Sequence, residues 1–275
     1  ILNSIADASM KEVPYVVEID SGIAGPAAAI IACTHGNEPV GLAAMQYLLS
    51  DLILRRGKLY FIIGNPEAAQ RYFSADCSRT KSSCRYIEKN LNRLPSKAEI
   101  SKGGVYEWRR AAELLPILEQ LDGVLDLHST SSNAPPMLIT VDDDGMELAT
   151  DALFPFEHVI ADIQKHLSGR FLIEYCERAK IRILAECGQH ECLDASQRAI
   201  DISLAFLHRM GLVEDFQPKA ENRQIHYYRA MQAIHPPKDC GEVKLRTLIA
   251  PFESLRAGQV VACNNQGIEI GRASC

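Results

Sequence analysis

The sequence predicts an α/β protein with a mostly parallel or mixed central sheet flanked by helices, followed by a small C-terminal β domain. Three observations predict it. Short apolar segments alternate with helix-length amphipathic segments over the first two-thirds of the chain, as in strands joined by helical crossovers. Chemically reactive side chains directly follow several apolar segments, where open α/β sheets place their sites. After Gly211, helical periodicity stops and turn signals take over.

Four apolar segments predict buried strands, and four amphipathic segments between and after them predict helices. The predicted strands are residues 27–33 ("AAAIIAC"), 58–64 ("KLYFIIG"), 123–128 ("GVLDLH") and 181–187 ("IRILAEC"). The predicted helices are residues 39–54, 105–121, 146–167 and 194–210. Pro39 suits the first turn of its helix because its missing N–H would have no partner there.

The change of pattern near residue 215 predicts a domain boundary. We expect residues 1–215 to form one large domain and residues 216–275 to form a small β-rich C-terminal domain. The second part carries turn signals at Pro236-Pro237, Gly258 and residues 264–267.

Composition excludes several classes of function. The chain has 275 residues, 47% hydrophobic and 23% charged, as in ordinary globular proteins. Its formal net charge of −6 gives no reason to expect nucleic acid or an anionic membrane as a partner. No apolar run reaches the ~18–20 residues of a membrane-spanning helix, and no secretory signal is visible. The sequence leaves the oligomeric state open, a homo-oligomer included.

The cysteines predict a reducing compartment. There are nine, an odd number, scattered without regular spacing through a chain large enough to build its own core. This pattern favours reduced thiols over a disulfide framework, and we expect a cytoplasmic location.

The segment "IIACTHGNEPVG", residues 30–41, suggests a metal site. An apolar strand ends there in His35 and Glu38, three residues apart. Catalytic zinc commonly has two histidines and a glutamate as protein ligands, with a fourth position left open. The H-x-x-E pattern alone is weak, because it recurs by chance and also suits a polar loop.

A third ligand is expected from another strand end, and His128 in "LDLHSTSS" is the candidate. Asp126, two residues earlier, points to the same side of a strand and could orient the imidazole. A lone histidine at a strand end is more often simply hydrogen-bonded. Both histidines, however, lie at carboxyl ends of predicted parallel strands, which favours the metal interpretation.

Two further segments carry polar side chains that no hydrophobic pattern explains. "CRYIEKNLNR" holds Arg85, Asn92 and Arg93, where guanidinium groups could bind a substrate carboxylate and stabilise an oxyanion. "ILAECG" ends an apolar strand in Glu186, which could act as general base beside a metal. The alternatives are a solvated loop for the first segment and a hydrogen-bonded buried acid for the second.

Together, H-x-x-E, R-x6-N-R, D-L-H-S and A-E-C-G, in this order, resemble the succinylglutamate desuccinylase/aspartoacylase family, a branch of the zinc-carboxypeptidase-like fold. The match spans about residues 32–188, and "NPEAAQ" (residues 65–70) resembles the N-P turn of that family.

The resemblance implies a role for each matching residue and a reaction. His35, Glu38 and His128 resemble the ligands of one zinc ion, and Glu186 resembles the catalytic base that activates a metal-bound water. Arg85 resembles the residue that polarises the scissile carbonyl. Asn92 and Arg93 resemble those that bind the substrate carboxylate. The implied substrate is a small-molecule N-acyl amino acid, hydrolysed at its amide bond, with esters also within reach of the chemistry. The resemblance thus implies that residues 1–215 are a zinc hydrolase catalytic domain.

The chain departs from aspartoacylase where that enzyme selects its acyl group. Tyr175 and Arg178 precede Glu186, but at distances that do not match the aspartoacylase pattern. Tyr227 and Tyr228 are only candidates for a tyrosine that caps the substrate. The identity of the substrate is therefore left open.

Other interpretations carry less support. "CGQHEC" crowds Cys187, His190 and Cys192 together, but no fourth ligand at a familiar spacing completes a structural zinc site. A carboxypeptidase-type peptidase with the same metal ligands is the alternative function. A non-catalytic binding module on the same fold is a third hypothesis, disfavoured because the candidate ligands and Glu186 are all intact.

Overall fold

The computed structural model describes residues 1–74, 81–141, 154–190, 192–214, 224–234, 242–245, 251–264, 267 and 269–272. Within it the chain forms two compact units, Ile1–Ala230 and Met231–Cys275. The boundary predicted after residue 215 falls before strand β8 (His226–Arg229), which pairs with β6 (His158–Ala161) in the sheet of the first unit. Pairing that is distant in sequence decides where this strand belongs.

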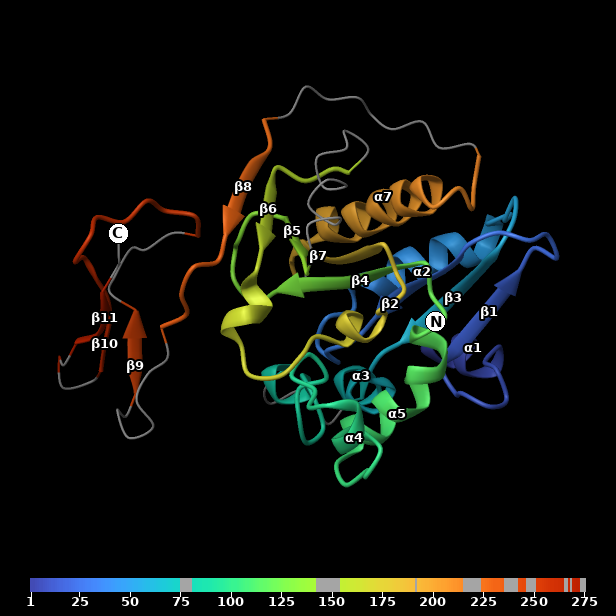
Figure 1. Ribbon diagram of the computed structural model, residues 1–275, viewed down its shortest axis with the longest axis horizontal. Helices are drawn as coiled ribbons and strands as arrows, with labels where there is room; N and C mark the ends of the chain where they lie inside the picture. The colour runs from blue at the N-terminus through green and yellow to red at the C-terminus, as the bar shows by residue number, and fades with distance from the viewer. Residues whose placement is uncertain are drawn as a thin grey trace. The chain divides into compact units, whose positions relative to one another are not determined.

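The first unit is built on an eight-stranded mixed sheet, which confirms the predicted α/β fold (Figure 1). Its order is β1-β3-β2-β4-β7-β5-β6-β8. The strands not yet given are β1 (Val16–Asp20), β2 (Ala27–Ala32), β3 (Lys58–Ile63), β4 (Gly123–Thr130), β5 (Met137–Thr140) and β7 (Ile181–Gln189). The central strands β3, β2, β4 and β7 are parallel, whereas β1 and β5 each pair antiparallel with the neighbouring strand of that group.

Helices cover both faces of the sheet because its central strands are apolar on both sides. Figure 1 shows α2 (Val40–Asp51) and α7 (Leu193–Arg209) on one face and α5 (Tyr106–Leu118), with α4 (Lys97–Ile100), on the other. In β2, Ala28 and Ile30 pack in the core shared with α2 and α7, whereas Ala29 and Ile31 pack in the core shared with α5. The apolar run at 27–33 is therefore a strand buried on both faces.

The remaining helical elements are short. They are α1 (Leu2–Asp7), α3 (Pro66–Phe73) and the 3₁₀ turns η2 (Lys81–Cys84), η3 (Ile163–His166) and η4 (Leu172–Tyr175).

One predicted helix is wrong where the structure describes it. The pattern at residues 146–167 contains β6 and η3 in its described part, and residues 146–153 lie outside the described residues. In β6, Val159 and Ala161 are buried between less buried neighbours, which is the alternation of a strand. Four residues of alternation are too few to outweigh a helix-like spacing of apolar residues around them.

The second unit contains a three-stranded antiparallel sheet, in agreement with the predicted β-rich C-terminal part. Its order is β11-β10-β9, with β9 at Val243–Leu245, β10 at Val260–Asn264 and β11 at Glu269–Arg272.

The cysteines depart in one place from the expectation of reduced thiols. Cys33, Cys176 and Cys187 are free and buried, and Cys192 and Cys263 are free as well. Cys84 is disulfide-bonded. Within the described residues, no helix has the length and apolar character needed to cross a membrane.

Candidate metal centre

The candidate site lies at the carboxyl ends of three adjacent parallel strands. Strands β2, β4 and β7 are neighbours in the sheet, so side chains that follow or end them meet at one edge. His35 and Glu38 follow β2, His128 lies near the end of β4, and Glu186 is its register partner in β7. The four residues that the sequence places at strand ends therefore lie at the same edge of the sheet.

A tight turn places His35 and Glu38 before α2. Cys33 follows β2 with a φ of 51°, in the left-handed region that few non-glycine residues adopt. The turn is held by hydrogen bonds from Glu38 N to His35 O (3.1 Å) and from Gly36 N to the carbonyl oxygen of Arg85 (2.9 Å). Both side chains are almost completely buried.

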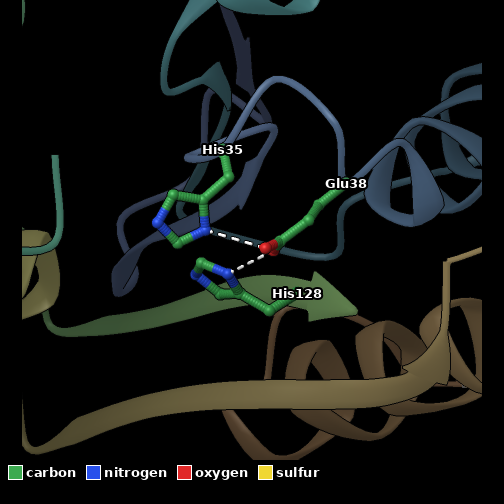
Figure 2. A group of neighbouring side chains, drawn as sticks. All are labelled: His35, Glu38 and His128. Atoms are coloured by element: carbon green, nitrogen blue, oxygen red, sulfur yellow. Dashed lines mark hydrogen bonds and ion pairs between the residues drawn. The ribbon is translucent and has the colours of Figure 1, made fainter. Parts of the chain in front are cut away.

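The two imidazoles converge on one carboxylate (Figure 2). His35 Nδ1 lies 2.9 Å from Glu38 Oε1, and His128 Nδ1 lies 2.6 Å from Glu38 Oε2. One ligand atom from each residue lies within 4.8 Å of the others. A single ion could therefore contact all three side chains.

The far nitrogen of each ring faces an oxygen acceptor. His35 Nε2 lies 3.0 Å from Asn90 Oδ1, and His128 Nε2 lies 2.8 Å from Asp126 Oδ2. When the ring proton is on Nε2, on the side of these oxygens, each Nδ1 keeps its lone pair for a ligand bond. Among the described residues His35 Nδ1 has no hydrogen-bond partner, although it lies 2.9 Å from Glu38 Oε1. Two imidazole nitrogens and a carboxylate form a donor set that fits zinc.

Electrostatics in the buried cluster balance the carboxylates against the rings. Burial opposes ionisation of Glu38, but His35 and His128 hold its pKa well below the usual range. Burial lowers the pKa of His35. Burial also opposes protonation of His128, yet Asp126 and Glu38 outweigh it and raise the pKa of that ring well above its ordinary value. Positive charge is therefore favoured at the centre of the cluster, where a cation would supply it.

Glu186 is the strand-end acid that sequence identified, and it lies beside this cluster. Its Oε2 is buried and has no hydrogen-bond partner among the residues that the structure describes. Burial raises the pKa of Glu186 to about 7, although His128 and Arg85 act in the opposite direction. A carboxyl group with a pKa near neutrality can both accept and return a proton.

Arg85 is the one predicted arginine that contacts the cluster directly. Its Nη1 donates to Glu38 Oε1 at 2.6 Å, and its Nη2 lies 3.1 Å from His35 Nε2. The guanidinium therefore supplies positive charge to a buried carboxylate.

Asn92 and Arg93 continue the same segment at greater depth. Asn92 is buried, with Nδ2 3.2 Å from His128 Nε2 and Oδ1 accepting from the backbone N–H of Leu172 at 2.9 Å. Arg93 donates to the carbonyl oxygen of Asn92 and lies over the ring of Phe171. Burial lowers the pKa of Arg93, and the nearby charge of Arg85 adds to the effect.

Two contributors were missed from sequence. Asn90 holds His35, yet in "KNLNR" nothing distinguishes it from Asn92. Thr34 donates its hydroxyl to Asp126 Oδ1 at 2.8 Å and so fixes the carboxylate that holds His128. A threonine at a strand end has too many ordinary uses for its sequence position to reveal this contact.

The residues that might have selected an acyl group lie elsewhere. Arg178 pairs with Asp122 at the amino-terminal end of β4, opposite His128. Tyr175 is buried, and its hydroxyl donates to the carbonyl oxygen of Pro95. Tyr228 contacts His158 from the edge strand β8, and the neighbouring Tyr227 is exposed.

The second cluster weighed from sequence, "CGQHEC", does not form a metal site among the residues that can be described. Cys187 donates to a strand carbonyl, and His190 Nδ1 lies 2.9 Å from Ser129 Oγ. Across the described ranges, His35, Glu38 and His128 are the only group of three or more such side chains within reach of one ion.

The fold and the buried His–Glu–His cluster thus define a class of α/β proteins with a candidate metal site at the sheet edge. Residues 24–210 match the model of the succinylglutamate desuccinylase/aspartoacylase catalytic domain. The chain belongs to this family.

Individual proteins agree with the assignment. Over 245 residues the chain is 28% identical to the aspartoacylase of Rattus norvegicus, covering 78% of this chain and 72% of that protein. It is 36% identical over 134 residues to a probable aspartoacylase of Synechococcus sp. (strain CC9605), covering 45% and 40%. It is 29% identical over 154 residues to an N-acyl-aromatic-L-amino acid amidohydrolase (carboxylate-forming) of Xenopus laevis, covering 49% and 47%. The matched segments thus span less than half of the last two relatives.

Solved structures show the same fold. The succinylglutamate desuccinylase of Chromobacterium violaceum has a TM-score of 0.64 at 20% identity, covering 90% of this chain and 81% of that one. The product-bound ectoine utilization protein EutE (DoeB) of Ruegeria pomeroyi has a TM-score of 0.64 at 16% identity, covering 94% and 79%.

Proposed function

We propose that this protein is a zinc-dependent deacylase that hydrolyses the amide bond of an N-acyl amino acid. The observation that carries the proposal is the convergence of His35 Nδ1, Glu38 and His128 Nδ1 beside the unpartnered carboxyl oxygen of Glu186. Family membership supports it, because three of its relatives are named for acylated amino acids or their hydrolysis.

His35, Glu38 and His128 would hold the metal. A zinc ion bound there supplies Lewis-acid chemistry, polarising a carbonyl oxygen and lowering the pKa of water. Asn90 and Asp126, beside Nε2 of the two rings, would favour the ring proton on that nitrogen and so leave Nδ1 for the metal.

Glu186 is the proposed general base and acid. It accepts a proton from the attacking water as the new carbon–oxygen bond forms, and delivers that proton to the amine as the carbon–nitrogen bond breaks. The products are a carboxylate and a free amino acid. Burial of Glu186 and its pKa of about 7 suit both directions of transfer.

The arginine segment, residues 85–93, is proposed to bind the substrate. Arg85, whose guanidinium lies at the candidate metal centre, would donate to the oxygen of the scissile carbonyl. Arg93 and Asn92 would bind the substrate carboxylate. Asn92 already holds Leu172 and lies against His128, so its contribution includes ordering this part of the site.

The acyl group and the amino acid are left open in the proposal. The names of two relatives point to different amino acids, and the positions of Arg178 and Tyr175 give no basis for transferring aspartoacylase specificity. A cytoplasmic location and a catalytic role for the part before residue 215 also stay predictions.

The test is a hydrolysis panel with wild-type protein and Glu186→Gln. We expect wild-type protein to release amino acid from at least one acetyl-, succinyl- or other N-acyl amino acid, with esters included in the panel. Glu186→Gln should retain zinc and lose turnover by roughly 100-fold or more, because a positioned base contributes about that much.

The panel also separates the alternatives. Cleavage of peptides with no cleavage of N-acyl amino acids would favour the carboxypeptidase-type function. Near wild-type turnover by Glu186→Gln would remove Glu186 from the role of base. Zinc content measured in the same samples separates loss of the base from loss of the metal.

A further inference from the structure

Glu107 is a completely buried acid on α5. It is neither a candidate metal ligand nor a residue with a role in the proposed reaction. It lies in the first turn of the helix, yet its carboxylate does not bond the amides of that turn. Instead it accepts hydrogen bonds from the consecutive backbone N–H groups of residues 87–89. The shortest run from Ile87 N to Oε1 (2.7 Å) and from Lys89 N to Oε2 (2.8 Å), with Glu88 N at 3.2 Å from Oε2.

These three amides belong to the segment of residues 85–90, whose two end residues contact the candidate metal ligands. Arg85, before them, contacts Glu38 and His35, and Asn90, after them, contacts His35. Both ends of the segment therefore contact the imidazole of His35, and the Glu107 carboxylate holds the backbone between these ends.

Apart from a hydrogen bond that the Glu88 carboxylate accepts from Tyr106 N, few contacts among the described residues fix the middle of the segment. The side chains of Tyr86, Glu88 and Lys89 are exposed, and the next fully buried apolar residue is Leu91. Consecutive backbone amides that converge on an anion form a strong, directional site because each hydrogen bond is charge-assisted.

The carboxylate also reaches the strand ends. Asn65 donates its Nδ2 to Glu107 Oε1 at 3.0 Å, and its backbone N–H donates to the carbonyl oxygen of Cys33 at the end of β2. Glu88 returns the contact from the loop, since its carboxylate accepts from the N–H of Tyr106 at the start of α5. One buried group thus joins α5, the turn after β3 and the arginine segment.

We infer that Glu107 is a positioning residue for the proposed reaction, holding residues 85–90 so that Arg85 and Asn90 meet His35 and Glu38. The inference rests on the proposed function for its catalytic consequence, whereas the ordering of residues 87–89 stands independently of it. In the described part of the chain, the Glu107 carboxylate bonds Asn65 and the amides of residues 87–89 and none of the three candidate metal ligands, so it acts through the loop.

The test compares Glu107→Gln with wild-type protein by hydrogen exchange, zinc content and steady-state kinetics. Glutamine has the same shape, but its amide group presents N–H donors to backbone donors. We expect the amides of residues 87–89 to exchange at least about tenfold faster, because they lose a charge-assisted partner. Zinc content should be unchanged, since all three ligands remain. The value of kcat/KM should fall roughly 100-fold, as expected when a reacting group is misplaced by about 1 Å.

Glu119→Gln is the matched control. Glu119 lies at the carboxyl end of the same helix, is half-exposed and pairs with Lys97 on the surface. Its exchange at residues 87–89, kcat and KM should equal those of wild-type protein. If Glu107→Gln does not fold, Glu107→Asp serves in its place, because it keeps the charge but draws it back by one methylene.

Two results would overturn the inference: unchanged exchange at residues 87–89, or faster exchange with kcat and KM unchanged in the folded protein. The second result would leave Glu107 with a structural role only, and the variant would then show a lower Tm without a change in kcat or KM. Absence of hydrolysis by wild-type protein would count against the proposed function instead. In that case the exchange rates at residues 87–89 still decide whether Glu107 orders the segment.

Discussion

Gly36 shows how closely the turn that carries the candidate metal ligands His35 and Glu38 is packed. A Cβ atom at this position would lie 2.2 Å from the carbonyl carbon of Ala68 and 2.4 Å from the carbonyl oxygen of Cys84. Both atoms belong to backbone, so neither can move aside as a flexible side chain could. The turn between His35 and Glu38 therefore requires glycine for close approach.

We predict that Gly36→Ala lowers the free energy of unfolding by about 1–3 kcal/mol, the usual cost of overpacking. Zinc content should fall as well, because the turn that carries two ligands must shift. Gly22→Ala is the control, since a Cβ there meets no atom within 4 Å although its φ of 72° costs some strain. Urea denaturation and metal analysis measure both effects. Wild-type stability and zinc content in Gly36→Ala would contradict the packing argument.

Sequence identified the residues whose position carried its own signal. His35, Glu38, His128 and Glu186 each end an apolar strand in a polar or ionisable side chain, which is costly without a task or a partner. Asn90 and Glu107 escaped because their sequence context is polar or helical, where asparagine and glutamate are ordinary. Their roles depend on contacts between segments that only the fold brings together.

At the level of elements, the strands predicted correctly are those buried on both faces. β2, β3, β4 and β7 are continuous apolar runs bounded by polar residues, so their pattern is strong. β1, β5, β6 and β8 were not predicted. They are four or five residues long and lie toward the two edges of the sheet, where pairing partners distant in sequence decide whether a strand forms.

The junction of β3 and α3 gives a test at this level. Asn65 is the N-cap of α3, accepting from Ala68 N at 3.1 Å, and also donates to Glu107. Aspartate caps a helix as well as asparagine does. It would, however, place a second carboxylate against the buried Glu107 and remove a donor from it.

We therefore predict that Asn65→Asp is less stable than Asn65→Ala, although alanine loses the cap at a cost of about 1 kcal/mol. The reason is that two like charges in a buried site repel each other, and this repulsion costs more stability than the loss of the hydrogen-bond donor at position 65. Free energies of unfolding from urea titrations compare the two variants. Equal stability of Asn65→Asp and wild-type protein would show that Glu107 does not sense position 65.

At the level of the whole molecule, two hydrophobic cores on opposite faces of the sheet hold a charged cluster at its edge. The burial that makes Glu186 suitable for proton transfer also carries a cost in stability. The pKa of Glu186 rises from 4.5 to about 7 in the folded protein. Its contribution to stability is therefore full below pH 4.5 and is lost as pH rises through about 7.

We predict that metal-free wild-type protein loses stability relative to metal-free Glu186→Gln as pH rises from 4.5 to 7. The expected change in the difference is about 3 kcal/mol, from 1.36 kcal/mol per pKa unit. Glutamine cannot ionise, so the variant lacks this dependence. Urea denaturation of both chelator-treated proteins at pH 5 and pH 8 measures it. If the difference in free energy of unfolding between the two proteins does not vary with pH, the raised pKa of Glu186 is contradicted.

The central claim is that His35, Glu38 and His128 hold one zinc ion and that hydrolysis requires it. Zinc bound per chain in His128→Ala, compared with wild-type protein, tests this claim most directly, with His226→Ala as a control histidine exposed on β8. We predict about one zinc in wild-type protein and in His226→Ala, as in a site with three protein ligands. In His128→Ala we predict little zinc and no hydrolysis of N-acyl amino acids. Unchanged zinc content in His128→Ala would contradict the account.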